Sequence, residues 1–264
     1  MSSDTVDLSL TDGVAYITLS RPERKNALSD EMAVGVVNTI DQAVENGARC
    51  IVVRGSEGAF SAGGDLEKMT ERLEGDQTTA EKVRSLRETT NAAVAAVATC
   101  RLPTIAAVDG PAVGAGANLA IACDIVLASE TTRIGFGFRN VGLTVDSGTS
   151  VLLPRMVGEH VAKELVYTGE LVEAERAAEL GLVNHIYPSD EFKSEVESFA
   201  ATIAEGPTAA LEFAKHRIER GGGEPLEPAL RDEALAQGVA FETRDHAEAV
   251  RALEDEQELS FEGH

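Results

Sequence analysis

The sequence has no tryptophan, and phenylalanine and tyrosine together make up only 4% of its 264 residues. Hydrophobic residues nevertheless make up 43% of the chain, so its core must be built from alanine, valine, leucine and isoleucine. No apolar run approaches the roughly 18 residues that a membrane-spanning helix needs. The length suits one large domain, or a domain with an appendage.

Positive charge is also scarce. The chain has 23 basic residues, of which six are lysines, against 45 acidic residues, and its formal net charge is −22. This excess of negative charge disfavours nucleic acids and anionic membranes as partners. The acidic residues are spread along the chain rather than gathered in a tail, which we interpret as a surface adapted to high salt.

Cysteine and histidine provide no recognisable metal site. The three cysteines, Cys50, Cys100 and Cys123, lie in apolar surroundings without C-x-x-C spacing, so we expect them to be buried and reduced. The five histidines show no ligand spacing, and we expect no metal. Residues 1–4 lack the basic stretch and apolar run of a signal peptide, so we expect a cytoplasmic protein.

The most informative stretch runs from Pro103 to Asp124. Residues 104–108 form a short apolar run that predicts a buried strand, and residues 109–111 predict a turn. Gly114-Ala115-Gly116 then opens an apolar segment that predicts a buried helix. Small residues at a helix start leave its free N–H groups open to an anion, or to an oxygen that becomes one. The alternative is that these glycines only let two elements pack closely.

A second glycine-rich turn, residues 58–66, follows the predicted strand at residues 50–53. Neither turn matches a nucleotide-binding motif, because no Gly-Lys-Ser/Thr occurs and Leu119 stands where a dinucleotide fingerprint has its third glycine. The basic loop Arg21–Leu28 is either a solvated connection or a cradle for a phosphate-bearing ligand.

The remaining pattern alternates strands with helices and ends in helices alone. Thr11-Asp12-Gly13 predicts a hairpin, and Asp65 and Asp124 are expected to fix turns or helix starts. The pattern therefore predicts an α/β body with a helical appendage. Helices are predicted from about residue 29 to 46, as one long helix carrying Val83 to Val97, and at 149–157, 159–168, 173–180, 189–205, 207–220, 225–242 and 245–257.

Five stretches together resemble the enoyl-CoA hydratase/isomerase (crotonase) superfamily, in the family's order from about residue 8 to about residue 220: Arg21–Leu28, Gly58–Leu66, Pro103–Asp124, Gly142–Gly158 and Ala178–Pro188. The resemblance implies an α/β fold, a crotonase-type spiral of repeated ββα units with a C-terminal helical region. We expect residues 1–195 to form the spiral core that binds and processes acyl-CoA. Residues 196–264 are expected to form a helical oligomerisation region, in a homotrimer or a dimer of trimers.

The resemblance also implies a coenzyme A thioester as the substrate, so that no separate cofactor is expected. Its thioester oxygen is expected between the backbone N–H groups of Gly64 and Ala115. Lys215 and Arg217, on a late helix, either reach the coenzyme of a neighbouring subunit or belong to a solvated helix face. The resemblance implies that the substrate is bound by Arg24, Lys25, Ala27, Ala62, Gly63, Asp65, Leu66, Asn118, Phe136 and Phe138.

The sequence departs from the hydratase pattern at two positions. Hydratases of the family place two glutamates around the acyl chain, and the matching residues here are Asn118 and Phe138. One carboxylate remains, Asp146, in a region where some isomerases of the family carry a catalytic aspartate and a related aryl-CoA dehalogenase carries a nucleophile. The alternative is that Asp146 caps the helix that begins near Thr149.

These features predict an enoyl-CoA isomerase in which Asp146 alone moves the proton, while Phe136 and Phe138 exclude water and raise the pKa of Asp146. Acyl specificity is expected to lie in residues 69–83 and 136–145. Three alternatives remain open: an enoyl-CoA hydratase of fatty-acid β-oxidation, a thioester hydrolase or dehalogenase with Asp146 as nucleophile, and a non-catalytic acyl-CoA-binding paralogue.

Overall fold

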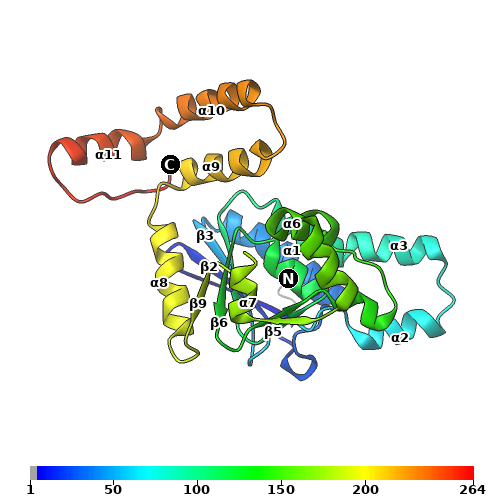
Figure 1. Ribbon diagram of the computed structural model, residues 1–264. Helices are drawn as coiled ribbons and strands as arrows, with labels where there is room; N and C mark the ends of the chain where they lie inside the picture. Colours follow the sequence, from blue (N-terminus) through cyan, green and yellow to red (C-terminus); the bar gives the residue numbers. More distant parts are fainter. Residues whose placement is uncertain (1–4) are drawn as a thin grey trace.

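The computed structural model describes residues 5–264. The expectation about a signal peptide rests on residues 1–4, which lie outside the described residues. Within residues 5–264 the strands form a six-stranded sheet in the order β1-β2-β3-β4-β6-β9 and a three-stranded sheet in the order β5-β7-β8 (Figure 1). The large sheet consists of β1 (Val6–Thr11), β2 (Val14–Leu19), β3 (Cys50–Gly55), β4 (Thr104–Val108), β6 (Ile125–Ser129) and β9 (His185–Tyr187). The small sheet consists of β5 (Pro111–Val113), β7 (Arg133–Gly135) and β8 (Leu171–Glu173).

The helices lie around the two sheets and beyond them. The predicted hairpin is confirmed, since β1 and β2 pair antiparallel, whereas β2, β3, β4, β6 and β9 pair in parallel.

The helices are α1 (Asp30–Glu45), α2 (Leu66–Glu74), α3 (Thr79–Glu88), α4 (Thr90–Ala98), α5 (Ala115–Ile121), α6 (Thr149–Thr168), α7 (Ala174–Glu179), α8 (Phe192–Ala204), α9 (Thr208–Gly221), α10 (Leu226–Ala240) and α11 (Arg244–Glu254), with 3-10 turns η1 (Pro22–Arg24) and η2 (Gly137–Val141).

The chain winds as a spiral whose turns repeat one pattern. β4 and β6 each lie in the large sheet, and each is followed by a short strand, β5 or β7, in the small sheet. The same pattern extends to the two preceding strands. The segment after β3 lies beside β5 through a bridge between Ser61 and Ala112, and the segment after β2 lies beside the segment after β3 through a bridge between Leu28 and Gly64. This arrangement confirms the expected crotonase-type spiral of ββα units.

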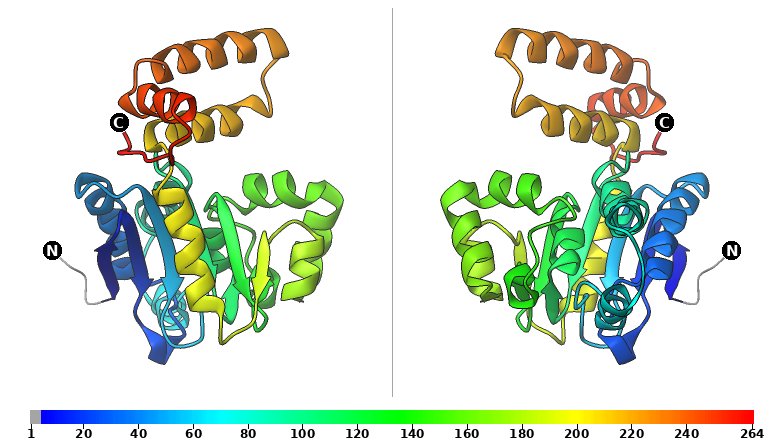
Figure 2. Two further views of the ribbon diagram at one scale, coloured as in Figure 1. Left: turned by 90° about the vertical axis from the view of Figure 1, so that its left-hand side faces the viewer. Right: turned by 90° about the vertical axis from the view of Figure 1, so that its right-hand side faces the viewer.

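The large sheet is covered on both faces. On one face Ile51 and Val53 of β3 join a core with Met32 and Val36 of α1 and with residues of α4 and α5. On the other face α8 packs its apolar side against β2, β3, β4 and β6, and Figure 2 shows it lying along that face. The expected boundary at 195/196 falls inside α8, whose packing belongs to the sheet.

Helices α9, α10 and α11 extend beyond the sheets as a separate group (Figure 1). Lys215 of α9 fastens this group to the core, because its Nζ lies 2.9 Å from Asp124 Oδ2 and donates to the Leu102 carbonyl at 3.0 Å. Its side chain is 8% exposed, so it neither reaches out to a coenzyme nor belongs to a solvated face. Arg217 pairs with Asp232 of α10 at 3.1 Å.

The single long helix predicted through residues 83–97 is wrong, because the chain breaks at Thr89, where φ is −116° and ψ is −97°. The Thr89 hydroxyl donates to the Ser85 carbonyl at 2.7 Å, which closes α3 at this break.

The three cysteines are buried and free, as expected, and burial raises the pKa of Cys50 to about 12. Within residues 5–264, no group of three or more His, Cys, Asp or Glu residues is placed to hold a metal ion. The same residues contain no helix that is long and apolar enough to cross a membrane.

Candidate active site

The two glycine-rich turns lie against each other, backbone to backbone. The Val113 amide donates to the Ser61 carbonyl at 2.9 Å. A methyl carbon placed on Gly63 would lie 2.3 Å from the Val113 carbonyl oxygen and 3.4 Å from the Ala115 nitrogen, and one on Gly116 would lie 2.5 Å from the Ser61 carbonyl oxygen. Glycine is required at both positions because the two backbones leave no room for a side chain.

Unused backbone amides occur in both turns, and they include those of Gly64 and Ala115. The Leu28–Gly64 bridge uses the Gly63 carbonyl, which accepts from the Leu28 amide at 2.7 Å, and the Gly114 amide donates to the Gly135 carbonyl at 2.8 Å. Among the described residues, the amides of Gly64 and Ala115 have no acceptor. Ala115 is the first residue of α5, so its N–H has no partner within the helix. The site therefore holds two free backbone donors on adjacent turns.

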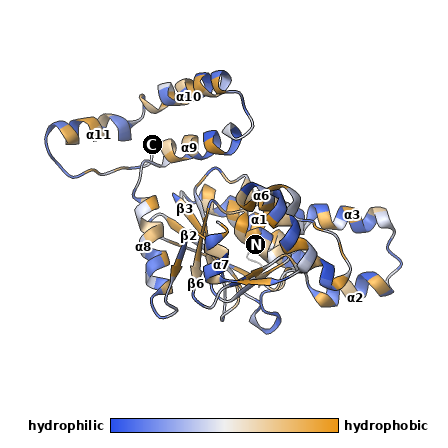
Figure 3. Cartoon of the chain, in the orientation of Figure 1, coloured by the Kyte–Doolittle hydropathy of each residue, from blue (hydrophilic) through white to orange (hydrophobic). Residues whose placement is uncertain are grey.

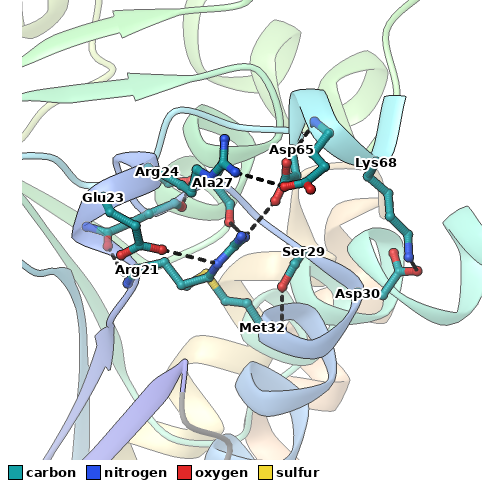
Figure 4. Close-up of polar contacts among 12 residues, drawn as sticks. Arg21, Glu23, Arg24, Ala27, Ser29, Asp30, Met32, Asp65 and Lys68 are labelled. Atoms are coloured by element: carbon teal, nitrogen blue, oxygen red, sulfur yellow. Dashed lines mark hydrogen bonds and ion pairs between the residues drawn. The ribbon is translucent and has the colours of Figure 1, made fainter. Parts of the chain in front are cut away.

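An ion pair holds the first turn in place. Asp65 caps α2 by accepting from the Glu67 amide at 3.0 Å, and its other oxygen lies 2.7 Å from Arg21 Nη1. The same Arg21 nitrogen donates to the Ala27 carbonyl at 2.9 Å (Figure 4). Burial opposes ionisation of Asp65, but its hydrogen bonds with Arg21 and Glu67 hold its pKa below the usual range. Asp65 thus fixes a helix start, as expected.

Sequence reasoning missed Arg21. It is the side chain that ties the basic loop to Asp65, across 44 positions of sequence. The sequence shows that Arg21 lies in a basic loop, but it does not show that Asp65 is its partner.

The other basic residues of this loop lie at the edge of the turn. Arg24 is exposed and pairs with the exposed Glu67 at 2.9 Å (Figure 4). Lys25 is exposed in the left-handed conformation, with φ of 50°, and its carbonyl accepts from the Ala62 amide at 2.9 Å. Two basic residues therefore lie in the loop that contacts the first turn. Of the apolar residues expected here, Ala27 is buried and Leu66 is 68% exposed.

Asp146 is attached to the second turn through its main chain. Its carbonyl oxygen accepts from Asn118 Nδ2 at 3.1 Å and from the Thr149 hydroxyl and amide at 2.9 and 3.0 Å. Asn118 stands three residues after Ala115 on α5, about one helical turn further on. Asp146 is therefore held near the free amide of Ala115.

The contacts of Asp146 and Asn118 define what these two side chains do in the fold. The Asp146 side chain does not cap α6, because Gly148 holds the N-cap position without a side-chain bond. Asn118 is fully buried, and its Oδ1 accepts from the Thr149 hydroxyl at 2.9 Å. Its amide therefore joins α5 to the segment that carries Asp146, and both of its polar groups are engaged within the protein.

The Asp146 carboxyl is in an environment that disfavours its charge. Burial raises the pKa of Asp146, while a hydrogen bond from the Ser147 hydroxyl at 2.9 Å and the positive charge of Arg72 oppose the rise. Phe138 of η2 is 8% exposed, and its ring lies 4.0 Å from the point where a side chain on Gly114 would begin. Phe136 is fully buried in the core, so of the two expected aromatic residues only Phe138 borders the turn.

Known proteins share this fold and much of this sequence. The chain matches the enoyl-CoA hydratase/isomerase family over residues 9–264. A Thermus thermophilus protein named as an enoyl-CoA hydratase is 39% identical over 244 residues, which span 91% of this chain and 94% of the relative. The 4-chlorobenzoyl coenzyme A dehalogenase-1 of an Arthrobacter species is 30% identical over 237 residues, which span 88% of this chain and 85% of that protein. A crystal structure of enoyl-CoA hydratase from Bacillus anthracis matches with a TM-score of 0.92 at 27% identity, over 99% of this chain and 100% of that one.

Proposed function

This chain belongs to the enoyl-CoA hydratase/isomerase family, whose members process acyl-CoA thioesters, and from that premise we propose that it is an enoyl-CoA isomerase. The observation that carries the proposal is that Asn118 of α5 bonds the main chain of Asp146, which attaches this carboxylate residue to the turn with the free amide of Ala115. An isomerase that moves one proton needs one acid–base group and a stabiliser for one oxyanion.

In the proposed reaction, the substrate is a β,γ-unsaturated acyl-CoA. The Asp146 carboxylate takes a proton from C2, and the electron pair of that C–H bond moves onto the thioester oxygen as an enolate. The amides of Gly64 and Ala115 donate to this oxygen, and the loss of one such donor typically costs about 10²–10³ in rate. The same carboxyl then returns the proton to C4, and the double bond comes to lie between C2 and C3.

Hydration would need a further group to activate water. The positions that match the family's glutamates hold Asn118, whose amide is engaged within the protein, and Phe138, which cannot accept a proton. This supports isomerisation over hydration, although hydratase names are frequent among the relatives. The coenzyme's phosphates are proposed to lie near Arg24 and Lys25.

The test is a paired assay with trans-3- and trans-2-enoyl-CoA at high salt. An isomerase converts the trans-3 substrate to a conjugated thioester, so the conjugated absorbance rises, whereas a hydratase consumes that absorbance in the trans-2 substrate. Asp146→Asn is expected to lower turnover by about 10²–10⁴. Asp190→Asn, at an exposed position before α8, is the matched control and is expected to behave as wild type.

Four results would contradict this proposal or the role of Asp146 in it. Near-normal turnover in Asp146→Asn would remove Asp146 from the chemistry. Consumption of crotonyl-CoA would favour a hydratase, and release of free coenzyme A would favour a thioester hydrolase. Binding of several acyl-CoAs without turnover would favour the non-catalytic paralogue.

We propose further that α9–α11 form the contact between subunits of a trimer or a pair of trimers. Large apolar side chains on this group are exposed, including Ile218 at 78% and Leu226 at 73%, and Figure 3 shows hydrophobic segments on all three helices. Sedimentation of the intact protein is expected to give a trimer or hexamer, and a monomer would contradict the proposal.

The acidic surface is proposed to depend on salt. With a net charge of −22, repulsion between surface carboxylates is screened by added salt. Dialysis to low ionic strength is expected to lower the melting temperature, and a melting temperature that stays constant up to molar salt would contradict a halophilic adaptation.

A further inference from the structure

One buried polar atom of the protein is not used by the fold. Asn91 lies in the first turn of α4, and its Oδ1 is buried without a hydrogen-bond partner. Among residues 5–264 it is the one buried side-chain oxygen or nitrogen in this condition. Folded proteins pair nearly all such atoms, because a buried acceptor that has lost water and gained no donor destabilises the fold. A ligand that brings a hydrogen-bond donor would account for this oxygen.

The fold places Asn91 at the same end of the large sheet as the two free amides. α4 leads through a short connection into β4, so the helix runs back along the strand and begins near the end where β4 stops. β3 and β4 are parallel, and the turns that present the amides of Gly64 and Ala115 follow the carboxyl ends of these two strands. Ligands of parallel α/β sheets bind beyond these ends.

A contact on the same face of α4 leads from Asn91 to Asp146. Val94 follows Asn91 by three residues, so the two side chains lie on one face of the helix. Val94 is buried, and its Cγ1 lies 3.8 Å from the point where a side chain on Gly148 would begin. Gly148 stands two residues after Asp146. This face of α4 therefore packs against the segment that carries the proposed base.

We propose that Asn91 binds a hydroxyl group on the acyl chain, so that the preferred substrate is a hydroxylated enoyl-CoA. This inference rests on the proposed function and names the substrate class of the same site. The hydroxyl has to lie beyond C4, because the reaction itself uses C2, C3 and C4. A hydroxyl suits both ends of the side-chain amide, since it can donate to Oδ1 and accept from Nδ2. An unsubstituted chain would bring only apolar groups to the buried oxygen and leave it unpaired.

The test compares trans-3-octenoyl-CoA with the same compound carrying a hydroxyl at C5, C6 or C7. For at least one of these positions, kcat/KM is expected to exceed that of the parent about 10- to 100-fold, because the parent leaves a buried acceptor without a donor. Asn91→Leu keeps nearly the same side-chain size and is expected to abolish this preference. Asn46→Leu makes the same change at an exposed asparagine at the end of α1 and is expected to retain it.

Thermal unfolding of Asn91→Leu provides a test without substrate. Its melting temperature is expected to equal or exceed that of wild type, because leucine removes an unpaired polar atom from a buried place. A clear fall in melting temperature would show that the Asn91 amide already has a partner in the folded protein, such as an ordered water molecule, and would overturn the inference.

Equal kcat/KM for all four substrates in wild type would overturn the inference, as would a preference that survives in Asn91→Leu. Calorimetric binding of the saturated analogues, with and without the hydroxyl, separates this inference from the proposed function. If no enoyl substrate is isomerised but a hydroxylated analogue binds more tightly in an Asn91-dependent way, the isomerase proposal fails and the hydroxyl site stands. Equal binding of all analogues overturns the hydroxyl site, whatever the activity.

Discussion

The two turns that present the free amides open onto very different helices. Gly114-Ala115 leads into α5, in which every residue is buried. Gly63-Gly64 leads into α2, in which no residue is buried, and it depends instead on the ion pair between Arg21 and Asp65. One half of the oxygen-binding site is therefore built into the core, while the other half is held by polar contacts near the surface.

This difference assigns different tasks to the two sides. The buried side also holds Asp146 through Asn118, so the groups that would carry the chemistry are fixed by packing. The exposed side carries the cations Arg24 and Lys25. Under the proposed function, recognition of the coenzyme part of the substrate would be concentrated where the structure is least packed, which is where specificity changes with the smallest effect on stability.

Gly116→Ala should destabilise the buried turn at the start of α5. The new methyl group would lie 2.5 Å from the Ser61 carbonyl oxygen and 2.7 Å from Ser61 Cβ, so the backbone of one turn must shift to admit it. We expect a loss of about 1–3 kcal/mol in the free energy of unfolding, measured by urea denaturation. Gly222→Ala, where no atom lies within 4 Å, is the control, and equal losses in the two variants would contradict this difference in packing.

Ser147→Ala should shift the pH dependence of the buried side. Its hydroxyl stabilises the ionised form of Asp146, so its loss should raise the pKa of Asp146 further above the ordinary 3.8. Because the proposed base is the carboxylate, kcat/KM falls as the pH drops through this pKa. The acidic limb of the pH profile should therefore move to higher pH in Ser147→Ala, and a limb that stays in place or moves to lower pH would contradict this role.

The same shift has a consequence for stability. A carboxyl whose pKa is raised in the folded state stabilises the fold while it is protonated, and this contribution is lost as the pH rises through the folded-state pKa. Asp146→Asn should therefore be more stable than wild type at neutral pH, with the difference disappearing in acid.

Gly64→Ala should have the smallest effect on folding. The added methyl group meets only the flexible end of Met69, at 2.7 Å, and α2 buries none of its residues. We expect a change within about 0.5 kcal/mol in the free energy of unfolding. A loss as large as that of Gly116→Ala would show that the two turns do not differ in packing.

Local sequence signals were sufficient for much of this architecture. Thr11-Asp12-Gly13 and the apolar runs at 50–53 and 104–108 predicted the hairpin and two strands of the large sheet. The strands of the small sheet have only three residues each, too few for a periodic pattern. Their existence depends on pairing across the spiral.

The residues that the sequence misplaced depend on partners far along the chain. The sequence left open whether Lys215 lies on a solvated helix face, whereas α9 brings it to Asp124. The sequence also did not indicate that Asn118 bonds the main chain of Asp146, 28 residues further on. Such contacts are fixed by tertiary packing rather than by local propensity.

The central claim of the proposed function is that the amides of Gly64 and Ala115 both donate hydrogen bonds to the thioester carbonyl oxygen. The most direct test is the infrared stretching frequency of a ¹³C-labelled thioester carbonyl in a bound acyl-CoA, compared with the same compound in water. Two aligned donors should lower this frequency, and they should lower it equally in Asp146→Asn, which leaves both amides in place. An unchanged frequency in the wild-type complex would contradict the account.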